Sequence, residues 1–523
     1  MRSPLSLYAE ARAAASAGAF DRASANFVAA LAAAPDNELI AGQALTHAVI
    51  AGNWDLALNA ARALERQNKL LPDARFLLLA EAFRARDWRA ARTQIDTIER
   101  EQLFGFAVPV LRAWVAFSSG EGDPLAALDA AGVSGIGAGY AAEHRALLLL
   151  AMARPEGPAE VARAARSAGP RGARLRVAGA AVLAARGDRA AALALLEGNA
   201  PSIQATRRLI EAGRPVPGAI ASADAGLAEM LVRLALDLHG QELTALGSMF
   251  ARIATRLAPD SGEAWMVAAE LLAQQERHML AVSLLANVGP DDPFATSVRE
   301  QRIRLLVGAG DREGALEVAL AATRTAPTRA DWVRLGEVYG ELGRQAESAE
   351  AFGRALEIRD DDGQAEWALW LMRGGALDQA NNWPEARRAL QQAYRLAPEQ
   401  PFVLNYLGYA QLIRRENVAE AERLIREAHR LAPDNAAITD SLGWALYLRG
   451  ELPEAIALLE QAARGEPADV EINEHLGDAY FAAGRRVEAR FAWKAALVYA
   501  EGEARTRISA KIDTGWTRAL AAR

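Results

Sequence analysis

One pattern returns at a nearly fixed interval in the C-terminal part of this 523-residue chain. Three Leu-Gly pairs, with glycines at Gly408, Gly443 and Gly477, stand 35 and 34 residues apart. Intervals of the same size separate small residues and prolines in each unit: Ala428, Ala462 and Ala496, and Pro398, Pro433 and Pro467. Such a period is typical of architectures in which each unit buries its apolar face against its neighbours. We therefore expect stacked units rather than one compact core.

Each unit is predicted to be two amphipathic helices joined by a tight turn. In residues 436–467, apolar residues recur at helical spacing in two groups, first Ile438, Leu442, Ala445 and Leu446, then Ala455, Leu458, Leu459 and Ala462. Gly450, between the groups, suits the left-handed conformation that often ends a helix. Gly443 lies within the first helix, where glycine costs about 1 kcal/mol relative to alanine. Its recurrence indicates two helices that approach too closely for a side chain.

The units also share bulky residues at fixed places, in the order Trp, Leu, Gly, Tyr on the first helix and Ala, Phe, Ala on the second. The unit from 331 contains Trp332, Leu335, Gly336, Tyr339, Ser348, Phe352 and Ala355, and the last full unit contains Leu476, Gly477, Tyr480, Ala489, Trp493 and Ala496. This pattern resembles the tetratricopeptide repeat family. The resemblance implies an all-α fold, an α-solenoid in which helix-turn-helix repeats form a right-handed superhelix.

The quality of the repeat pattern changes along the chain, and this suggests four segments. The segment 213–218 contains two glycines and two prolines and is the predicted boundary between the first two segments. The predicted segments are divergent N-terminal TPR-like helical repeats in 1–212, TPR-like helical repeats in 219–330, a regular TPR array in 331–502, and a C-terminal capping helix in 503–523. In the last segment, Ile508, Ile512 and Trp516 form a predicted buried stripe.

The residue types needed for catalysis or cofactor binding are missing or scattered. The chain has no cysteine, and its six histidines lie in separate units without the spacing of metal ligands. None of its three lysines belongs to a phosphate-binding glycine loop. The protein is therefore predicted to be no enzyme, with no catalytic residue, no metal and no cofactor.

Charge and hydropathy limit the partners. A formal net charge of −7 argues against nucleic acid as the default partner. No apolar run approaches the roughly 20 residues that a membrane-spanning helix needs. Glu10 and Arg12 interrupt the N-terminus before an apolar core of a signal peptide could form, so no leader is expected in the chain as given. The sequence leaves the oligomeric state open.

In the tetratricopeptide family, the first helices of successive repeats line a concave groove that binds a peptide or a protein. The residues that the resemblance places in this groove are Phe402, Asn405, Tyr406, Tyr409, Asp440, Trp444, Tyr447, Glu471, Glu474, Asp478 and Phe481. Tyr409, Trp444 and Phe481 are expected to lie along one groove that the carboxylates make negative. The alternative for each aromatic residue is that it only packs against neighbouring helices.

The predicted groove differs from that of the co-chaperones that hold a C-terminal carboxylate with lysine, arginine and asparagine. Only Asn405 resembles that set, and the other positions are acidic or aromatic. A basic or apolar protein segment is therefore the expected ligand.

Residues 404–409, 440–447 and 474–478 resemble those of tetratricopeptide proteins from Gram-negative bacteria. The resemblance implies a scaffold or adaptor in the periplasm or in a cell-envelope complex. A cytoplasmic assembly factor or co-chaperone is the alternative.

Overall fold

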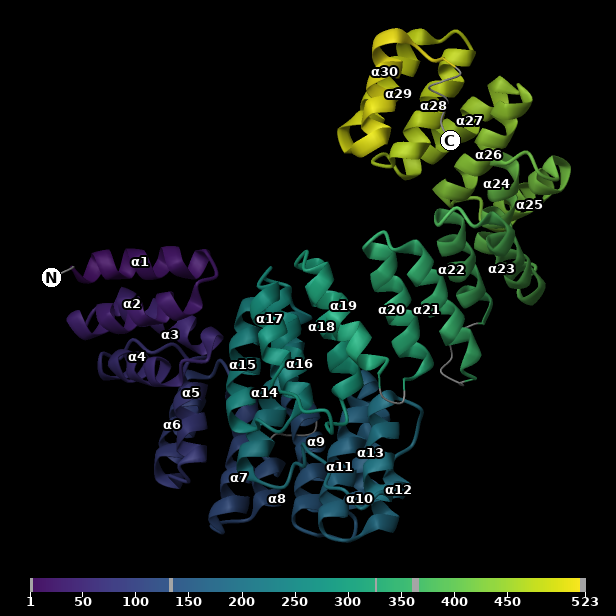
Figure 1. The fold of residues 1–523 in the computed structure, drawn as a ribbon. Coiled ribbons are helices and arrows are strands. Elements are labelled where there is room, and N and C mark those ends of the chain that lie inside the picture. Colours follow the sequence, from purple (N-terminus) through teal and green to yellow (C-terminus); the bar gives the residue numbers. More distant parts are fainter. Residues whose placement is uncertain (1–2, 131–134, 325–326, 360–365, 518–523) are drawn as a thin grey trace. The chain divides into compact units, whose positions relative to one another are not determined.

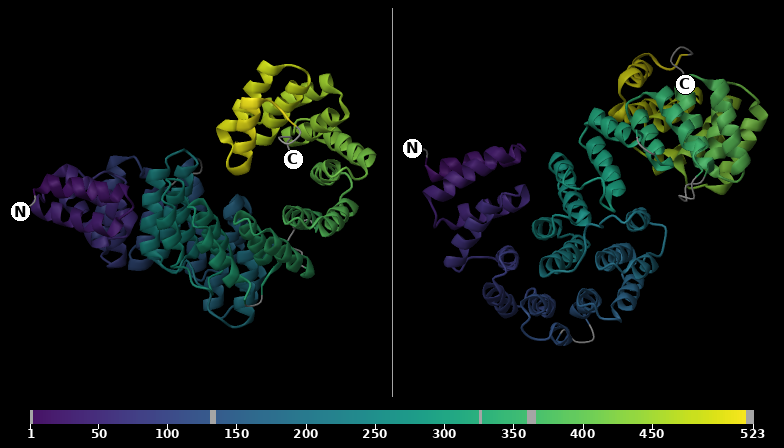
Figure 2. Two further views of the ribbon diagram at one scale, coloured as in Figure 1. Left: turned by 45° about the horizontal axis from the view of Figure 1, so that its top comes forward. Right: turned by 60° about the horizontal axis from the view of Figure 1, so that its bottom comes forward.

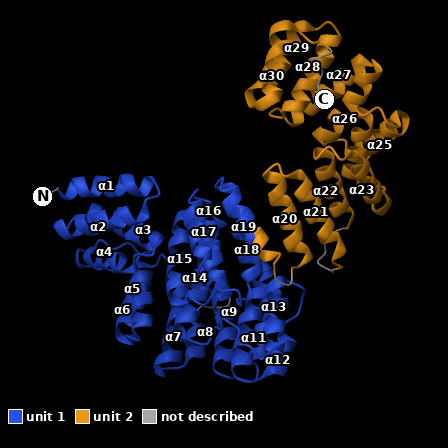
Figure 3. Cartoon of the chain, viewed as in Figure 1, with its two compact units in different colours: residues 1–318 blue, residues 319–523 orange. Residues whose placement is uncertain are grey.

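The computed structural model describes residues 3–130, 135–324, 327–359 and 366–517. These ranges contain thirty α-helices and two short 3₁₀ helices, and no β-strand occurs among them (Figure 1). Neighbouring helices along the chain pack against one another in pairs, α1 on α2, α3 on α4 and so on. The predicted all-α, α-solenoid fold is confirmed. The chain forms two compact units, residues 1–318 and 319–523 (Figure 3).

The first unit begins with short helices whose pairing follows the predicted repeats. Its helices are α1 (Pro4–Ser16), α2 (Phe20–Ala33), α3 (Glu38–Ala51), α4 (Trp54–Arg66), α5 (Arg75–Arg84), α6 (Trp88–Glu101), η1 (Gly105–Ala107), α7 (Val108–Ser119), α8 (Pro124–Asp129), α9 (Ile136–Ala151), α10 (Gly157–Ser167), η2 (Gly169–Arg171), α11 (Gly172–Ala185), α12 (Arg189–Leu195), α13 (Pro201–Glu211), α14 (Ala223–His239), α15 (Thr244–Leu257), α16 (Gly262–Ala273), α17 (His278–Leu285), α18 (Ala295–Gly308) and α19 (Arg312–Ala322). The last of these, α19, crosses the division between the units.

Helices α14 and α15 lie inside the curve made by the helices before them. Helix α14 packs against α5, α7 and α9, and α15 packs against α3 and α5. The right-hand view of Figure 2 shows the purple and blue helices curving around them. A Cβ on Gly226 would lie 2.1 Å from the Trp114 ring, so the contact between α14 and α7 requires glycine. The inner side of this curve is thus filled by the chain's own helices.

Buried charges join the inner helices to the outer ones. Arg171 bridges Glu143 on α9 and Glu229 on α14 at 2.8 and 2.7 Å, and Arg174 on α11 also contacts Glu229. Burial would raise the pKa of Glu229, but Arg174 and Arg171 outweigh it and lower that pKa. Such a network fixes geometry because an unpaired charge there would be costly.

The division at Val318 and Ala319 differs from the predicted segments. The segment 213–218 lies within the first unit, because α14 and α15 after it pack against helices before it. Its Gly218 is held on both sides: its carbonyl accepts a hydrogen bond from Arg174, and its N–H lies 3.4 Å from Asp260.

The second unit contains five helix pairs and one further helix. They are α20 (Arg329–Glu341), α21 (Gln345–Glu357), α22 (Glu366–Gln379), α23 (Trp383–Leu396), α24 (Pro401–Ile413), α25 (Val418–Leu431), α26 (Ala436–Arg449), α27 (Leu452–Gly465), α28 (Val470–Ala482), α29 (Arg486–Tyr499) and α30 (Gly502–Thr514). Helix α26 shows how the sequence sets these bounds. The Asn435 side chain accepts a hydrogen bond from the N–H of Ile438, and the helix ends at Gly450 with φ of 85°.

The recurring glycines lie where the two helices of a pair come closest. A Cβ on Gly443 would lie 2.8 Å from Leu459 Cγ, and one on Gly477 would lie 2.3 Å from Trp493 Cδ1. Both neighbouring side chains are fully buried and belong to the second helix of the pair. The glycine spacing seen in the sequence therefore records a close helix contact, and Gly443→Leu would overpack it.

The helix α30 covers the last pair. Ile508 is fully buried against Trp493 and Ala496, whereas Ile512 and Trp516 are partly buried in the same cluster. Trp516 follows the end of α30 at Thr514, so only two residues of the predicted stripe are helical. Residues 518–523 of the predicted capping segment lie outside the described residues.

The packing role of Gly477 can be tested by substituting it with alanine, with the helical Gly42 as the control. Gly477→Ala should destabilise the second unit by about 1–3 kcal/mol, since the methyl group would collide with Trp493. Gly42 lies inside α3 with no neighbouring atom within 4 Å of its Cβ position, so Gly42→Ala should stabilise by up to about 1 kcal/mol. Chemical unfolding followed by circular dichroism measures both. Equal effects of the two changes would contradict the packing role of Gly477.

Candidate functional site

The predicted groove residues lie on the first helices of three successive pairs. Helix α24 carries four of them, α26 carries three and α28 carries four, in this order: Phe402, Asn405, Tyr406 and Tyr409; Asp440, Trp444 and Tyr447; Glu471, Glu474, Asp478 and Phe481. Helix α24 contacts α26, and α26 contacts α28, so these helices form one continuous row. The row has a buried centre, a covered end and an exposed end.

The buried centre is built around Trp444. Only 4% of this residue is exposed, and its ring stacks on His475 at 3.9 Å and on Tyr447 at 4.5 Å. His475 Nδ1 lies 2.9 Å from Asp440 Oδ2. Trp444 and Asp440 are therefore packing and ion-pairing residues in this structure, and neither offers a free surface to a ligand. For Trp444, the structure agrees with the alternative that it packs against the neighbouring helix.

Burial would lower the pKa of His475, but Asp440, with smaller contributions from Glu471 and Asp478, outweighs burial and raises that pKa above its ordinary value of 6.5. His475 thus pairs with Asp440 on α26 and lies 3.9 Å from Glu471 on its own helix, so it joins two repeats. His475 therefore contacts α26 in two ways, by its ion pair with Asp440 and by the stacking of its ring on Trp444.

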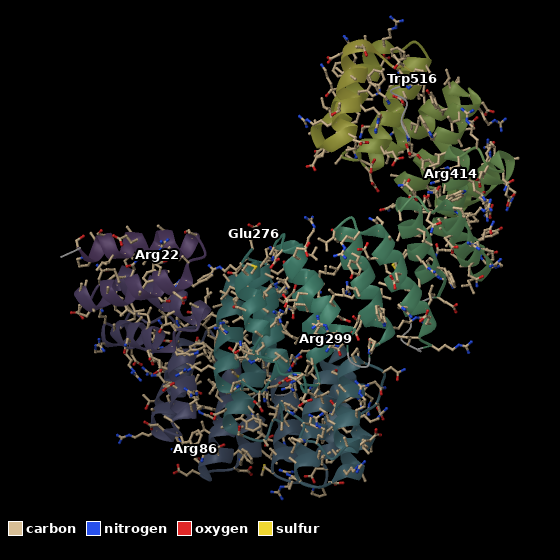
Figure 4. The ribbon with its side chains drawn as sticks, in the orientation of Figure 1. Arg22, Arg86, Glu276, Arg299, Arg414 and Trp516 are labelled. Carbon is tan, nitrogen blue, oxygen red and sulfur yellow. The ribbon has the colours of Figure 1, made fainter. Side chains whose placement is uncertain are left out.

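The covered end consists of Glu474 and Asp478, which α30 and the segment after it approach. Lys511 Nζ lies 2.7 Å from a carboxylate oxygen of each, and Arg507 forms a second ion pair with Glu474 at 2.7 Å. The indole of Trp516, labelled in Figure 4, donates to Asp478 at 3.1 Å. Burial would raise the pKa of Glu474, but Arg507 and Lys511 lower it. These two carboxylates are occupied by the chain's own cations.

Phe481 also lies at the covered end and does not join Trp444 in a row. Its ring is 5.7 Å from that of Trp493, and Gly515 approaches it. Counting from the recurring glycine explains the difference. Tyr409 and Trp444 each follow that glycine directly, whereas Phe481 stands four residues after Gly477 and corresponds to Tyr447.

The exposed end lies on α24 and reaches Glu471. Phe402 is 54% exposed, and the Tyr409 hydroxyl donates to the exposed Glu471 at 2.7 Å, across two repeats. Asn405 is half-buried, and its Oδ1 has no hydrogen-bond partner in the described part of the chain. Burial, with Asp378 nearby, raises the pKa of Tyr406 to about 12. The spacing of Phe402, Asn405 and Tyr409 places an exposed ring, an unmatched amide oxygen and the hydroxyl that reaches Glu471 on one face of α24.

Sequence reasoning missed the residues of α30 that contact this row. Lys511 and Arg507 lie one repeat length after the acids that they bind, as His475 lies one repeat length after Asp440. Reading α30 as the first helix of one more repeat would have found both contacts.

The described residues hold no group of three or more His, Asp or Glu side chains placed to bind a metal ion. None of the described helices is both long and apolar enough to cross a membrane. What the row offers is a surface of aromatic and acidic groups.

The pH dependence of stability tests the role of His475. A raised pKa in the folded state means that protonation stabilises the fold below about pH 6.5, and that this stabilisation is lost as pH rises through the folded-state pKa. His475→Gln should therefore flatten the fall in Tm between about pH 6.5 and pH 9.

The control for this measurement is His429→Gln. Burial lowers the pKa of His429, so this histidine is neutral in both states above about pH 6.5 and adds no slope there. His429→Gln should keep the wild-type slope. An unchanged slope in His475→Gln would contradict the ion pair with Asp440.

Comparisons with known proteins agree with the repeat geometry. A family model described as "Tetratricopeptide repeat" matches residues 371–436, and one described as "TPR repeat" matches residues 443–484. No curated protein matches this sequence.

Similar solved structures share little sequence with this chain. The crystal structure of MamA is 21% identical, with 32% of this chain and 94% of that chain covered and a TM-score of 0.26. The crystal structure of the APC/C hetero-tetramer Cut9-Hcn1 is 15% identical, with 92% of this chain and 97% of that chain covered and a TM-score of 0.39. The crystal structure of a tetratricopeptide repeat protein from Parabacteroides merdae ATCC 43184 is 14% identical, with 55% of this chain and 97% of that chain covered and a TM-score of 0.38.

The two family models cover residues on α22–α28, the same helices that carry the recurring glycines and most of the aromatic and acidic row. The first model spans the helices from α22 to α25 and the second those from α26 to α28, so residues 371–436 and 443–484 of this chain are tetratricopeptide repeats.

Proposed function

We propose that this protein is a non-enzymatic scaffold or adaptor that binds a peptide segment or a protein partner along the first helices of its C-terminal repeats. Tetratricopeptide repeats imply a role in protein interaction. The observation that carries the proposal is the exposed end of the row, where Phe402, Tyr409 and Glu471 lie on helices that the repeat stacking aligns. An exposed aromatic ring beside a carboxylate supplies contact area together with charge.

The chemistry of the partner is inferred from what already occupies the covered end. There, Glu474 and Asp478 bind a segment of this chain that carries Arg507, Lys511 and the apolar Trp516. A partner with basic and apolar residues would find a similar acidic and aromatic surface at Glu471, Tyr409 and Phe402. We therefore propose a basic, partly apolar protein segment as the ligand.

A place in a bacterial cell-envelope complex, in the periplasm or at the envelope, is part of the proposal. It rests on the resemblance of residues 404–409 and 440–447 to proteins of that kind. Fractionation of cells that express the full-length protein tests it. Recovery in the cytoplasmic fraction would favour the alternative role of an assembly factor or co-chaperone.

The binding proposal predicts a specific effect of Phe402. Once a partner has been captured and identified, Phe402→Ala should weaken its binding at least about tenfold, because truncated aromatic residues at interface centres commonly cost 2 kcal/mol or more. Glu471→Gln should mainly reduce the dependence of association on salt, since Glu471 is exposed. Calorimetric titration at two salt concentrations measures both.

Two control variants make the result specific. Phe491→Ala removes a similarly exposed phenylalanine from the second helix α29 and should leave the affinity unchanged. Trp444→Ala is unsuitable as a binding test, because removing a buried aromatic side chain costs about 3–5 kcal/mol of stability. If folded Phe402→Ala binds the partner with wild-type affinity, the partner does not bind at this row.

A further inference from the structure

The outer face of α29 carries a row of exposed apolar side chains. Val487, Phe491 and Val498 are 67%, 68% and 69% exposed, and Tyr499 is also exposed. The first three are spaced four and seven residues apart, which places them on one side of the helix. The opposite side of α29 holds Ala489, Ala492, Trp493 and Ala496 in the core. This row is distinct from the one proposed to bind protein, which lies on the first helices of the pairs.

Two of these places, those of Phe491 and Val498, are mostly arginine in earlier repeats. The buried alanines Ala386, Ala421, Ala455 and Ala489 mark equivalent positions in α23, α25, α27 and α29. Counted from them, the equivalents of Phe491 are Arg388, Arg423 and Ala457, and the equivalents of Val498 are Arg395, Arg430 and Arg464. At the places of Phe491 and Val498, the last second helix is thus apolar where five of the six counterparts are arginine.

Four of those five arginines bond to a side chain of their own helix. Arg423 pairs with Glu420 at 2.8 Å, and Arg430 pairs with Glu427 at 2.7 Å. Such i to i+3 pairs form an ordinary solvated helix surface. In α29 the one nearby carboxylate, Glu488, is already paired with Arg485 at 3.0 Å.

A row of cations runs beside the apolar row. Arg486, Arg490 and Lys494 are exposed and spaced four residues apart, one position before Val487, Phe491 and Ala495. No carboxylate of the described residues lies within 4.0 Å of these three cations, and Arg490 Nε donates to the carbonyl of Ile512. Three positive charges without acidic partners therefore flank exposed apolar side chains, on a chain whose formal net charge is −7.

We propose that this face of α29 binds an anionic lipid surface, with Val487, Phe491 and Val498 entering the boundary between headgroups and acyl chains. Arg486, Arg490 and Lys494 then contact the phosphate groups. Helices that lie at a bilayer surface combine these features, apolar and aromatic residues on one side with lysine and arginine beside them. Anionic membranes attract nearby lysine and arginine side chains, and tyrosine is favoured at headgroup level.

The geometry favours a lipid surface over a second copy of this chain. The apolar side chains lie on one side of a single helix, so a flat surface can reach all of them at once. Two copies packed antiparallel through this face would bring two rows of three cations together, and like charges at short distance repel.

Vesicle sedimentation tests the proposal with the full-length protein. The wild type should bind vesicles of equal parts phosphatidylcholine and phosphatidylglycerol, and should bind phosphatidylcholine alone at least about tenfold more weakly. The double variant Phe491→Gln, Val498→Gln should lose at least about tenfold in affinity for the anionic vesicles. Both positions are more than two-thirds exposed, so its unfolding transition should match that of the wild type.

A matched pair of charge variants shows whether the site or the bulk charge matters. Arg486→Gln with Lys494→Gln and Arg423→Gln with Arg430→Gln remove the same charge from α29 and from α25. Only the first pair should weaken vesicle binding. Equal weakening by both pairs, no binding of the wild type, or equal binding to both kinds of vesicle would each overturn the proposal. A wild-type dimer that Phe491→Gln, Val498→Gln converts to a monomer in light scattering would assign this face to a second copy instead.

Discussion

The C-terminal repeats depend on direct contact between the backbone of one helix and a large side chain of the next. Gly443 faces Leu459, and Gly477 faces Trp493, at distances that leave no room for a methyl group. Because the two helices can approach so closely, the alanines of the second helix also reach the core. The first helices are then held in register, which aligns their outward side chains in a row. The surface proposed for binding is a consequence of this packing.

Along this row, contacts within the chain determine which carboxylates are paired with cations and which stay exposed to solvent. Glu474 and Asp478 are neutralised by Lys511 and Arg507, since buried carboxylates without cations would be costly. Glu471, on the same helix, stays exposed; it accepts a hydrogen bond from the Tyr409 hydroxyl and lies 3.9 Å from His475 Nε2. The covered end of the row thus contributes stability, whereas the exposed end is available for recognition.

The sequence predicted those parts of the structure that repeat. The interval between Gly443 and Gly477 was enough to place helices, turns and close contacts, because each repeat solves the same local packing problem. The place of α14 and α15 could not be predicted in this way. The contact between Gly226 and Trp114 joins residues far apart in the sequence, and it occurs once.

The candidate site was predicted only in part for a related reason. Position in a repeat identified the correct helices, but it did not tell whether the next repeat would cover a side chain. Trp444 is covered because His475 of the next repeat stacks on its ring and pairs there with Asp440. Phe402 remains open on α24. Exposure along the row is therefore decided by pairs of residues in neighbouring repeats.

The inner helices of the first unit also affect the order in which that unit can fold during synthesis. An ordinary solenoid folds repeat by repeat as it leaves the ribosome, because every contact is local. Here Arg252 on α15 donates to the carbonyl of Ile50, a separation of 202 residues. At synthesis rates of about 5–20 residues per second, α3 waits roughly 10–40 s for the helix that fills its inner side. Throughout that interval the helices before α14 lack the partners that fill their inner side in the finished unit.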